Sequence, residues 1–399
     1  FTNETRCELE DADDESAQVY LAACNGTTAG GGYELALACK EIYLIDDGNS
    51  AVSLPEVPLL AVLPGTGGLT RLVDKRKIRR DRADVFSTTA EGIRGKKAVA
   101  WGLVDGCFPR SKFDQKIAER AKALAEAGSA RLRPGARVGV TLGPITPTRE
   151  ANARLYKHVE LRWDDSSRIA HLTIRGPSAE DVAIVQRGAE AIHAAGDQLW
   201  ALRAFRELDD ALLYARVNLM NIGLVLVRAE GDPARVLAHD QALWAAREHW
   251  FVHEVILHMG RALRRMDLTS RSFFALGDAG TAFVGCLLEL ALASDRFYLL
   301  DDPDDAVQVG VSPLSDGALP MSHGLSRLAA HLHGEPALLA DLAGKHALLD
   351  PSEADEAGLV TVLLDDIDWD DDTRVAIEER ASLSPDALTG MEASLRWVG

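Results

Sequence analysis

Short apolar runs alternate with longer segments of helical periodicity along most of the chain. The runs at 19–24 (VYLAAC) and 41–46 (EIYLID) have the length and the apolar content of strands. Residues 197–216 instead place apolar side chains every three or four positions, which predicts a helix, and the run at 223–229 (GLVLVRA) predicts a buried strand after it. This alternation indicates an α/β fold whose strands are mainly parallel and covered on both faces.

Residues 129–154 differ in composition from their neighbours, because prolines and glycines gather there. A composition of this kind is typical of a linker, and its prolines and glycines include Pro134, Gly135, Gly139, Gly143, Pro144 and Pro147. A helix predicted over 114–127 precedes this segment, with Gly128 at the position of a C-terminal cap. We therefore expect a first domain over 1–128 and a second domain, which ends in a helical tail, over 155–399.

Two stretches of the chain repeat one another in residue type and spacing. GGGYELALACKEIYLIDD at 30–47 matches VGCLLELALASDRFYLLDD at 284–302. The identical pairs, 255 or 256 residues apart, include Glu34 and Glu289, Tyr43 and Tyr298, Asp46 and Asp301, Pro64 and Pro320, Arg71 and Arg327, and the Gly-Leu-Val triplets at 102–104 and 358–360. One inserted residue explains the change of spacing, so we expect two copies of one domain.

The second copy has more chain in front of its matched part than the first copy has. Runs at 159–163 (VELRW) and 168–174 (RIAHLTI) predict a strand hairpin there, ahead of the helix and strand predicted over 197–229. The first copy would need about a hundred further residues before Phe1 to hold the same elements. We therefore expect the first copy to lack its N-terminal part and the chain to be a piece of a longer protein.

The charge balance is acidic, with 43 Lys and Arg against 61 Asp and Glu and a formal net charge of -18. A field of that sign repels polyanions, so we expect neither a nucleic acid nor a membrane as a partner. No window approaches the roughly 18 apolar residues that a membrane span needs. The five cysteines are an odd number without CxxC spacing, which favours the reducing cytoplasm and argues against a zinc module.

Glycines and carboxylates gather in the first copy. Residues 30–32 are three glycines directly before a helix in which we expect Glu34 to be the second residue. Glycines let a ligand approach the backbone, and the free N–H groups at a helix start suit a developing oxyanion. Glu56 follows before a second glycine-rich turn at 64–68, and two carboxylates beside an oxyanion hole suit general acid and base catalysis. The same residues also fit a tight turn flanked by two structural acids.

Three motifs in this order resemble the crotonase superfamily, also called the enoyl-CoA hydratase/isomerase superfamily. They are AxxNGxxxGGGxELALAC from residue 22, LPEVxLxxxLPGxGGxxRL from residue 54, and AxxWGLVD from residue 98. The resemblance implies a spiral of ββα units in each copy and an acyl-CoA thioester as the substrate. It also implies that two backbone N–H groups polarise the thioester carbonyl.

The resemblance assigns roles by position. Gly31 would supply one N–H group of the oxyanion hole, and the other would come from a loop that precedes Phe1. Glu34 and Glu56 would match the two acid/base glutamates of the family. The residues implied to line the substrate are Gly30, Pro55 and Gly65.

The tandem arrangement and the run at 53–86 narrow the resemblance to family members that act on an epoxidised aromatic acyl-CoA. It implies hydrolytic opening of the ring of 2,3-epoxybenzoyl-CoA with two waters and release of formate, in aerobic benzoate breakdown. It implies no metal and no cofactor, since coenzyme A is part of the substrate, and a homo-oligomer such as a dimer. A general enoyl-CoA hydratase or isomerase and a non-catalytic acyl-CoA-binding module stay open as alternatives.

The second copy departs from the pattern where the chemistry should be. Cys286 stands at the position of Gly31, Ser312 aligns near Glu56, and Ala238 replaces a glycine in the oxyanion loop expected at 234–240. We expect this copy to be a scaffold.

Two further signals are weaker. His249 and His253 are four residues apart, but their spacing is not the HExxH of a metal site, so a packed helix is favoured. The basic cluster at 74–82 (DKRKIRRDR) would attract coenzyme A phosphates, contact another subunit or lie on a solvated face.

Overall fold

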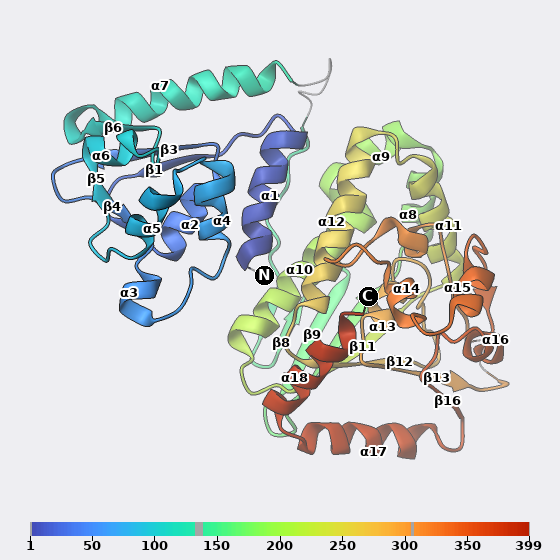
Figure 1. Cartoon of the computed structure of the whole chain (residues 1–399). Helices are drawn as coiled ribbons and strands as arrows, with labels where there is room; N and C mark the ends of the chain where they lie inside the picture. The colour runs from blue at the N-terminus through green and yellow to red at the C-terminus, as the bar shows by residue number, and fades with distance from the viewer. Residues whose placement is uncertain (1, 132–138, 305–306, 399) are drawn as a thin grey trace. The chain divides into compact units, whose positions relative to one another are not determined.

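The computed structural model describes residues 2–131, 139–304 and 307–398, and the chain divides into two compact units (Figure 1). Unit 1 is Phe1–Gly139 and unit 2 is Val140–Gly399. Among the described residues, no helix combines the length and the apolar character needed to cross a bilayer.

A three-stranded parallel sheet organises unit 1. Its strands lie in the order β1 (Leu21–Cys24), β3 (Glu41–Asp46) and β6 (Gly106–Pro109). Helix α2 (Gly31–Ala38) covers one face, where Tyr33 and Leu37 join the buried core. Helix α7 (Arg110–Ser129) covers the other face, where Phe113 packs against Tyr43 and Ile45. Because both faces of the sheet are covered, the central residues 42–45 of β3 are all buried and apolar rather than alternating with polar ones.

The remaining elements of unit 1 surround this sheet. Strand β4 lies between β2 and β5 in a second small sheet, parallel to β2 and antiparallel to β5. These elements are α1 (Thr2–Glu15), β2 (Thr28–Ala29), β4 (Ala51–Ser53), α3 (Glu56–Leu60), α4 (Gly68–Thr70), the π-helical turn η1 (Arg71–Lys75), α5 (Arg80–Ser87), β5 (Ile93–Arg94) and α6 (Gly95–Ala100).

Unit 2 is built on an eight-stranded sheet in the order β16-β13-β12-β11-β10-β9-β8-β7. The strands from β10 to β16 are parallel, and those from β7 to β10 are antiparallel. Their bounds are β7 (Thr148–Glu150), β8 (Ala153–Leu155), β9 (Val159–Asp164), β10 (Ile169–Arg175), β11 (Leu224–Glu230), β12 (Ser272–Gly277), β13 (Arg296–Asp301) and β16 (Val362–Asp365). A separate pair consists of β14 (Val309–Gly310) and β15 (Leu348–Leu349).

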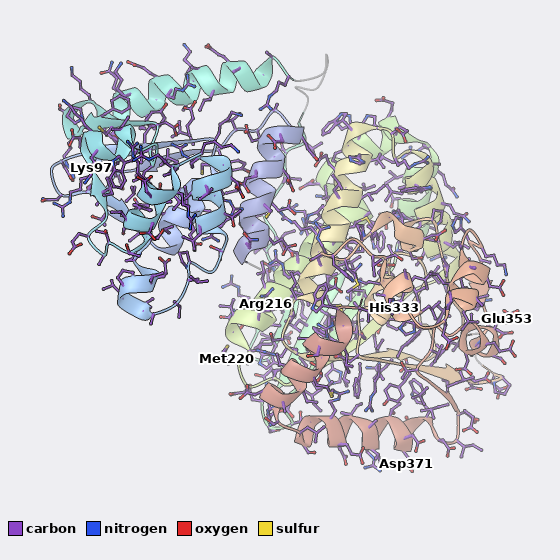
Figure 2. All side chains as sticks on the ribbon, in the orientation of Figure 1. Lys97, Arg216, Met220, His333, Glu353 and Asp371 are labelled. Atoms are coloured by element: carbon purple, nitrogen blue, oxygen red, sulfur yellow. The ribbon has the colours of Figure 1, made fainter. Side chains whose placement is uncertain are left out.

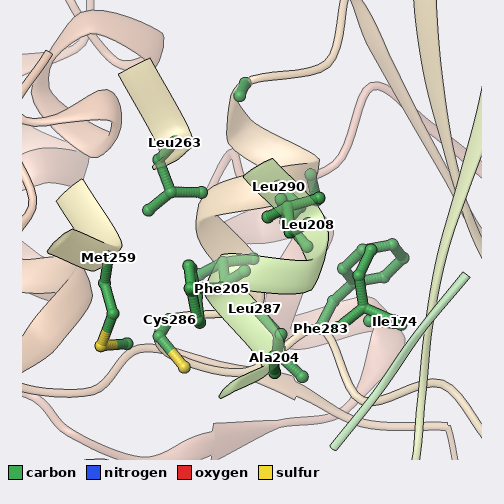
Figure 3. Close-up of a cluster of buried hydrophobic side chains, with 14 of the residues drawn as sticks. Ile174, Ala204, Phe205, Leu208, Met259, Leu263, Phe283, Cys286, Leu287 and Leu290 are labelled. Atoms are coloured by element: carbon green, nitrogen blue, oxygen red, sulfur yellow. The ribbon is translucent and has the colours of Figure 1, made fainter. Parts of the chain in front are cut away.

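Helices cover both faces of the large sheet. On one face the buried core includes Phe205 and Leu208 of α10 and Met259 and Leu263 of α12, and Phe283 belongs to the same cluster (Figure 3). The helices of unit 2 are α8 (Ala179–Gln186), α9 (Ala189–Ala195), η2 (Gly196–Gln198), α10 (Trp200–Asn218), α11 (Pro233–Ala245), α12 (Trp250–Asp267), α13 (Leu288–Leu292), η3 (Leu314–Ala318), α14 (Arg327–His331), α15 (Pro336–Leu342), α16 (Pro351–Glu356), α17 (Trp369–Ser382) and α18 (Pro385–Arg396).

Helix α17 packs against the opposite face of that sheet. Its Trp369 and Ile377 lie against the buried Phe274 and Tyr298. Figure 2 shows Asp371 on the outer side of the helix, where it is exposed. The acidic run around Trp369 therefore includes one apolar anchor, and its exposed aspartates face solvent.

The two units repeat one order of elements. The order along the chain in unit 1 includes α1, β1, α2, β3 and β6. The corresponding order in unit 2 is α12, β12, α13, β13 and β16, and its three strands pair in the same parallel order. The small sheets match as well, because Thr28 pairs with Val52 in unit 1 and Val284 forms a parallel bridge with Gly310 in unit 2. The repeat in the sequence is therefore also a repeat of local structure.

Several predicted elements are found. Strands occupy most of 19–24, 41–46 and 223–229, and the hairpin of β9 and β10 and the long helix α10 lie where their patterns indicate. The prediction that Gly128 caps a helix is wrong, since Gly128 lies inside α7. A Cβ at that residue would lie 2.4 Å from the Ala17 carbonyl oxygen, so close packing explains the glycine.

The linker predicted over 129–154 is wrong in its second half. Strand β7 and most of β8 lie there and extend the large sheet, because each pairs with its neighbour in an antiparallel ladder. Pro134 and Gly135 lie outside the described residues.

The largely buried His258 on α12 makes the stability of unit 2 depend on pH. Burial, together with the nearby Arg261, lowers the pKa of His258 to about 4. The unfolded chain binds a proton at this residue below about pH 6.5 and the folded chain does not, so stability present above pH 6.5 is lost as the pH falls toward 4.

We expect His258→Gln to remove part of this loss, about 1–2 kcal/mol at pH 5, because glutamine does not titrate. Thermal unfolding at pH 7 and pH 5 measures it, with the exposed His333→Gln as the control. The prediction would be contradicted if the Tm fell equally between pH 7 and pH 5 in His258→Gln and in the unmodified chain.

Candidate active site

The backbone at Gly30 sets the start of helix α2. Gly30 has φ 55° and ψ -130°, a conformation that glycine adopts without strain. Its N–H donates to the Ser53 carbonyl at 3.0 Å, and its own carbonyl accepts from the Glu34 N–H at 2.9 Å. Gly31 is the first residue of the helix, so its N–H has no carbonyl partner one turn earlier.

This geometry corrects the position expected for Glu34. Glu34 is the fourth residue of α2 rather than the second, because Gly31 and Gly32 lie in the helix instead of before it. The positive φ of one residue, Gly30, is enough to turn the chain from β2 into the helix.

Glu34 is held by the glycine-rich turn at 64–68. Its side chain is 3% exposed, and its Oε1 accepts hydrogen bonds from the Thr66 N–H at 3.0 Å and the Gly68 N–H at 2.9 Å. Two backbone donors fix one carboxylate oxygen in place. The structure thus brings together two motifs that are more than 30 residues apart in the sequence.

Glu56 approaches the start of α2 at Gly30. It is the first residue of α3, with Pro55 at the N-cap. Its Oε1 lies 3.1 Å from the position that a Cβ at Gly30 would take. Its Oε2 is buried, and no described residue pairs with it. Both glutamates therefore come to the start of α2, next to Gly31.

The residues expected to line a substrate are partly open. Gly31 and Gly65 are exposed, and a Cβ at Gly65 would meet no described atom within 4 Å. Exposed apolar side chains follow Glu56 directly along the chain: Val57, Leu59, Leu60, Val62 and Leu63. A buried carboxylate beside an exposed glycine N–H and apolar surface can serve acid and base chemistry on a partly apolar carbonyl compound.

Two arginines and a glutamate support this site, and the sequence analysis did not assign them to it. Arg71 donates to the Thr66 carbonyl at 2.8 Å and pairs with Glu10 at 2.8 Å, and Arg6 donates to the Gly31 carbonyl at 2.8 Å. They hold the turn and the helix start from α1. The repeat of Arg71 at Arg327 was the only signal for this role in the sequence.

Two residues of the basic cluster at 74–82, Lys75 and Arg76, bond to other residues of unit 1. Lys75 bonds to Glu10 and to the Ala38 carbonyl, and Arg76 pairs with Asp105. Lys75 and Arg76 line a cavity of about 440 Å³ near the C-terminal end of α2, away from the glycine end that holds the glutamates. Attraction of a coenzyme phosphate by this cluster stays a prediction.

The matching glutamate of unit 2, Glu289, has a different partner from Glu34. Glu289 is 1% exposed and pairs with Arg327 at 2.7 Å, and Arg327 also holds Asp267. Burial raises the pKa of Glu289 above its ordinary value, although Arg327 opposes the shift. In unit 1 the corresponding Arg71 pairs with Glu10 and leaves Glu34 to the backbone N–H groups. Glu289 is thus fixed in a buried ion pair.

Other residues of unit 2 also depart from a catalytic arrangement. The segment 234–240, expected as an oxyanion loop, lies in helix α11, so this prediction is wrong; Pro233 at the helix start and the Asp232 cap favour the helix. The Cys286 thiol points into the apolar core (Figure 3), and burial raises its pKa.

The remaining signals have structural explanations. Burial also raises the pKa of Cys24 and Cys39 in unit 1, which opposes thiolate formation. His249 caps α12, with its Nδ1 accepting from the Phe251 N–H. Within the described ranges, no group of three or more His, Cys, Asp or Glu could hold a metal ion.

The chain is similar to one family over a defined region. The sequence profile of the enoyl-CoA hydratase/isomerase family matches residues 4–137. Over 398 residues the chain is 50% identical to the benzoyl-CoA-dihydrodiol lyase of Aromatoleum evansii, and the match covers 100% of this chain and 70% of the lyase.

Two more distant similarities are found. The chain is 36% identical over 191 residues to the fatty acid oxidation complex subunit alpha of Vibrio cholerae, which covers 47% of this chain and 25% of that subunit. Among solved structures, an enoyl-CoA hydratase/isomerase from Marinobacter aquaeolei is 17% identical and aligns with a TM-score of 0.43, over 61% of this chain and 84% of that one.

We expect Gly68→Ala to disturb the turn that holds Glu34. The new Cβ would lie 2.8 Å from Glu34 Oε1 and 3.0 Å from its Cγ, so the buried side chain must shift, at a cost of about 1–3 kcal/mol. Urea unfolding compares it with Gly65→Ala, whose Cβ meets open space. Equal loss of stability in the two variants would contradict this assignment.

We expect Arg327→Met to destabilise unit 2 by about 3–5 kcal/mol, because it leaves Glu289 and Asp267 buried without their partner. Arg71→Met is the matched control in unit 1 and should cost less, since Glu10 is 26% exposed. Urea unfolding with hydrogen exchange measures each unit separately. A larger loss in Arg71→Met would reverse the order that burial predicts.

Proposed function

The chain belongs to the enoyl-CoA hydratase/isomerase family, also called the crotonase family, and on that premise we propose that it opens the ring of 2,3-epoxybenzoyl-CoA by hydrolysis. The identity of 50% to a benzoyl-CoA-dihydrodiol lyase supports an enzyme of this kind. Two waters would be consumed, formate would be released, and a semialdehyde of dehydroadipyl-CoA would remain. We place this reaction in aerobic benzoate breakdown, in the cytoplasm that the cysteine pattern favours.

In the proposed reaction, the thioester carbonyl accepts a hydrogen bond from the Gly31 N–H. Charge that passes into the thioester enolate is stabilised there, because the donor is fixed before the reaction begins. Gly30, Pro55 and Gly65 would line the ring end of the substrate, next to the exposed apolar residues that follow Glu56.

The unpaired Oε2 of Glu56 is the observation that supports this proposal most. A buried carboxylate oxygen without a partner among the described residues is costly unless a ligand uses it. A water molecule would donate a hydrogen bond to the ionised carboxylate, and an epoxide oxygen would accept one from the protonated carboxyl. Glu34 is held at Oε1 by two N–H groups, which fixes its carboxylate for the second proton transfer. One glutamate would deprotonate water while the other protonates the epoxide oxygen.

Unit 1 would hold the working site in this proposal, and unit 2 would be its scaffold. Glu289 is paired with Arg327, and Ser312 stands where unit 1 has Glu56. We further propose that both units are crotonase-like domains and that the protein assembles as a dimer.

A general enoyl-CoA hydratase or isomerase is the second candidate. The match of the enoyl-CoA hydratase/isomerase profile to residues 4–137 favours it, because the candidate glutamates and glycines lie within that region. Addition of water to crotonyl-CoA without formate release would identify this activity.

We expect Glu34→Gln and Glu56→Gln in the intact protein each to lower formate release from 2,3-epoxybenzoyl-CoA by at least about a hundredfold. Glutamine keeps the size of the side chain and the acceptor oxygen but cannot move a proton. Glu126→Gln, on the exposed face of α7, is the matched control. Full activity in both variants would contradict the proposal, and tight acyl-CoA binding without turnover in the intact protein would indicate the binding module instead.

A further inference from the structure

Asp240 lies in the middle of unit 2 with no exposure to solvent. Its Oδ2 accepts hydrogen bonds from the Cys286 N–H at 2.7 Å and from the Ser312 hydroxyl at 2.7 Å. The other oxygen, Oδ1, lies 3.6 Å from Nδ1 of the buried His239. A carboxylate is therefore bound between a backbone N–H and a hydroxyl, in the manner of a small anionic ligand.

The position of this carboxylate follows from the repeat. Gly285 has φ +52°, as Gly30 has φ +55°, and each accepts the N–H of the repeated glutamate, Glu289 or Glu34. Each also donates its N–H to a strand carbonyl, of Gly310 in unit 2. The Cys286 N–H thus stands in unit 2 where the Gly31 N–H stands in unit 1.

The residue opposite the glycine matches as well. A Cβ at Gly285 would lie 2.4 Å from the Ser312 hydroxyl oxygen, and a Cβ at Gly30 would lie 3.1 Å from Glu56 Oε1. The same Cβ at Gly285 would lie 2.1 Å from Asp240 Oδ2. Asp240 therefore occupies the space in front of the helix start, between the N–H group and the residue that replaces the glutamate.

We propose that the turn at Gly285 and Cys286, together with Ser312, forms a carboxylate-binding site in unit 2 that the chain fills with its own Asp240. The bound side chain occupies the place of an oxyanion, so unit 2 is closed to an acyl thioester. The ligand class that this site takes is a small carboxylate, because the two donors converge on one oxygen of a planar anion.

This occupation explains why the site persists in a unit that has lost other features of the pattern. A buried N–H and a buried hydroxyl without acceptors would each destabilise the fold, and Asp240 satisfies both. Glu289 and Ser315 satisfy neither of these donors, since Glu289 bonds to Arg327 and the Ser315 hydroxyl bonds to the Ser312 backbone.

The test replaces the internal ligand with an external one. Asp240→Ala removes a carboxylate and leaves room of about the size of formate. We expect this variant to unfold at a lower temperature than the unmodified chain. We expect about 100 mM sodium formate, compared with sodium chloride, to raise its Tm by about 3 °C more than that of the unmodified chain. Acetate should act less, because its methyl group needs further space.

Asp240→Asn is the matched control, since its carboxamide fills the same space and leaves no room for formate. Formate should shift its Tm as little as that of the unmodified chain. If Asp240→Ala does not fold in chloride, the refolding yield in formate against chloride gives the same comparison. Equal effects of formate on all three proteins, or no gain in refolding, would overturn the proposal. The readout is stability, so it is independent of whether unit 1 has the proposed activity.

Discussion

The candidate site depends on the backbone conformation of one glycine. With φ 55°, Gly30 points its N–H to the strand carbonyl of Ser53 and its carbonyl to the N–H of Glu34. A residue with a Cβ would be strained there and would also press on Glu56. Because this turn joins β2 to α2, it fixes the direction of the first helical N–H groups and the places of both glutamates. Gly285 repeats the conformation in unit 2, which is why the two helix starts can be compared atom by atom.

The two units differ in how they compensate a buried glutamate. In unit 1, neutral backbone donors hold Glu34, and the cation Arg71 is directed to Glu10 instead. In unit 2, the cation itself holds Glu289 and shares its charge with Asp267. Backbone dipoles therefore compensate the carboxylate of Glu34, and a full positive charge compensates that of Glu289. The same pair of residue types is arranged differently in the two units, because the arginine pairs with the helical glutamate only in unit 2.

Local patterns in the sequence predicted much of the fold. The apolar runs of β3 and β11, the period of α10 and the turn between β9 and β10 each depend on neighbouring residues, and each is found. The predictions fail where a contact with a residue distant in the sequence determines the local structure. Gly128 is a glycine because the Ala17 carbonyl approaches it, and 148–155 form strands because β9 accepts them as neighbours. At the site, the glycines and the two glutamates could be named from the sequence. The sequence could not reveal the hydrogen bonds from Thr66 and Gly68, the support from Arg71 or the role of Asp240. Their partners are at least five residues and up to 72 residues away along the chain.

Polar groups that are buried inside a folded protein need hydrogen-bond partners. Ser312 stands in unit 2 where unit 1 has Glu56, and both Ser312 and Cys286 are buried. The N–H of Cys286 and the hydroxyl of Ser312 therefore need acceptors that solvent does not provide. An apolar side chain in the place of Asp240 would leave both donors unpaired. A side chain with a carboxylate satisfies both donors at once and needs only one helix, α11, to carry it. Because 234–240 form a helix rather than the expected loop, Asp240 is carried on a rigid element that holds its carboxylate against these two donors.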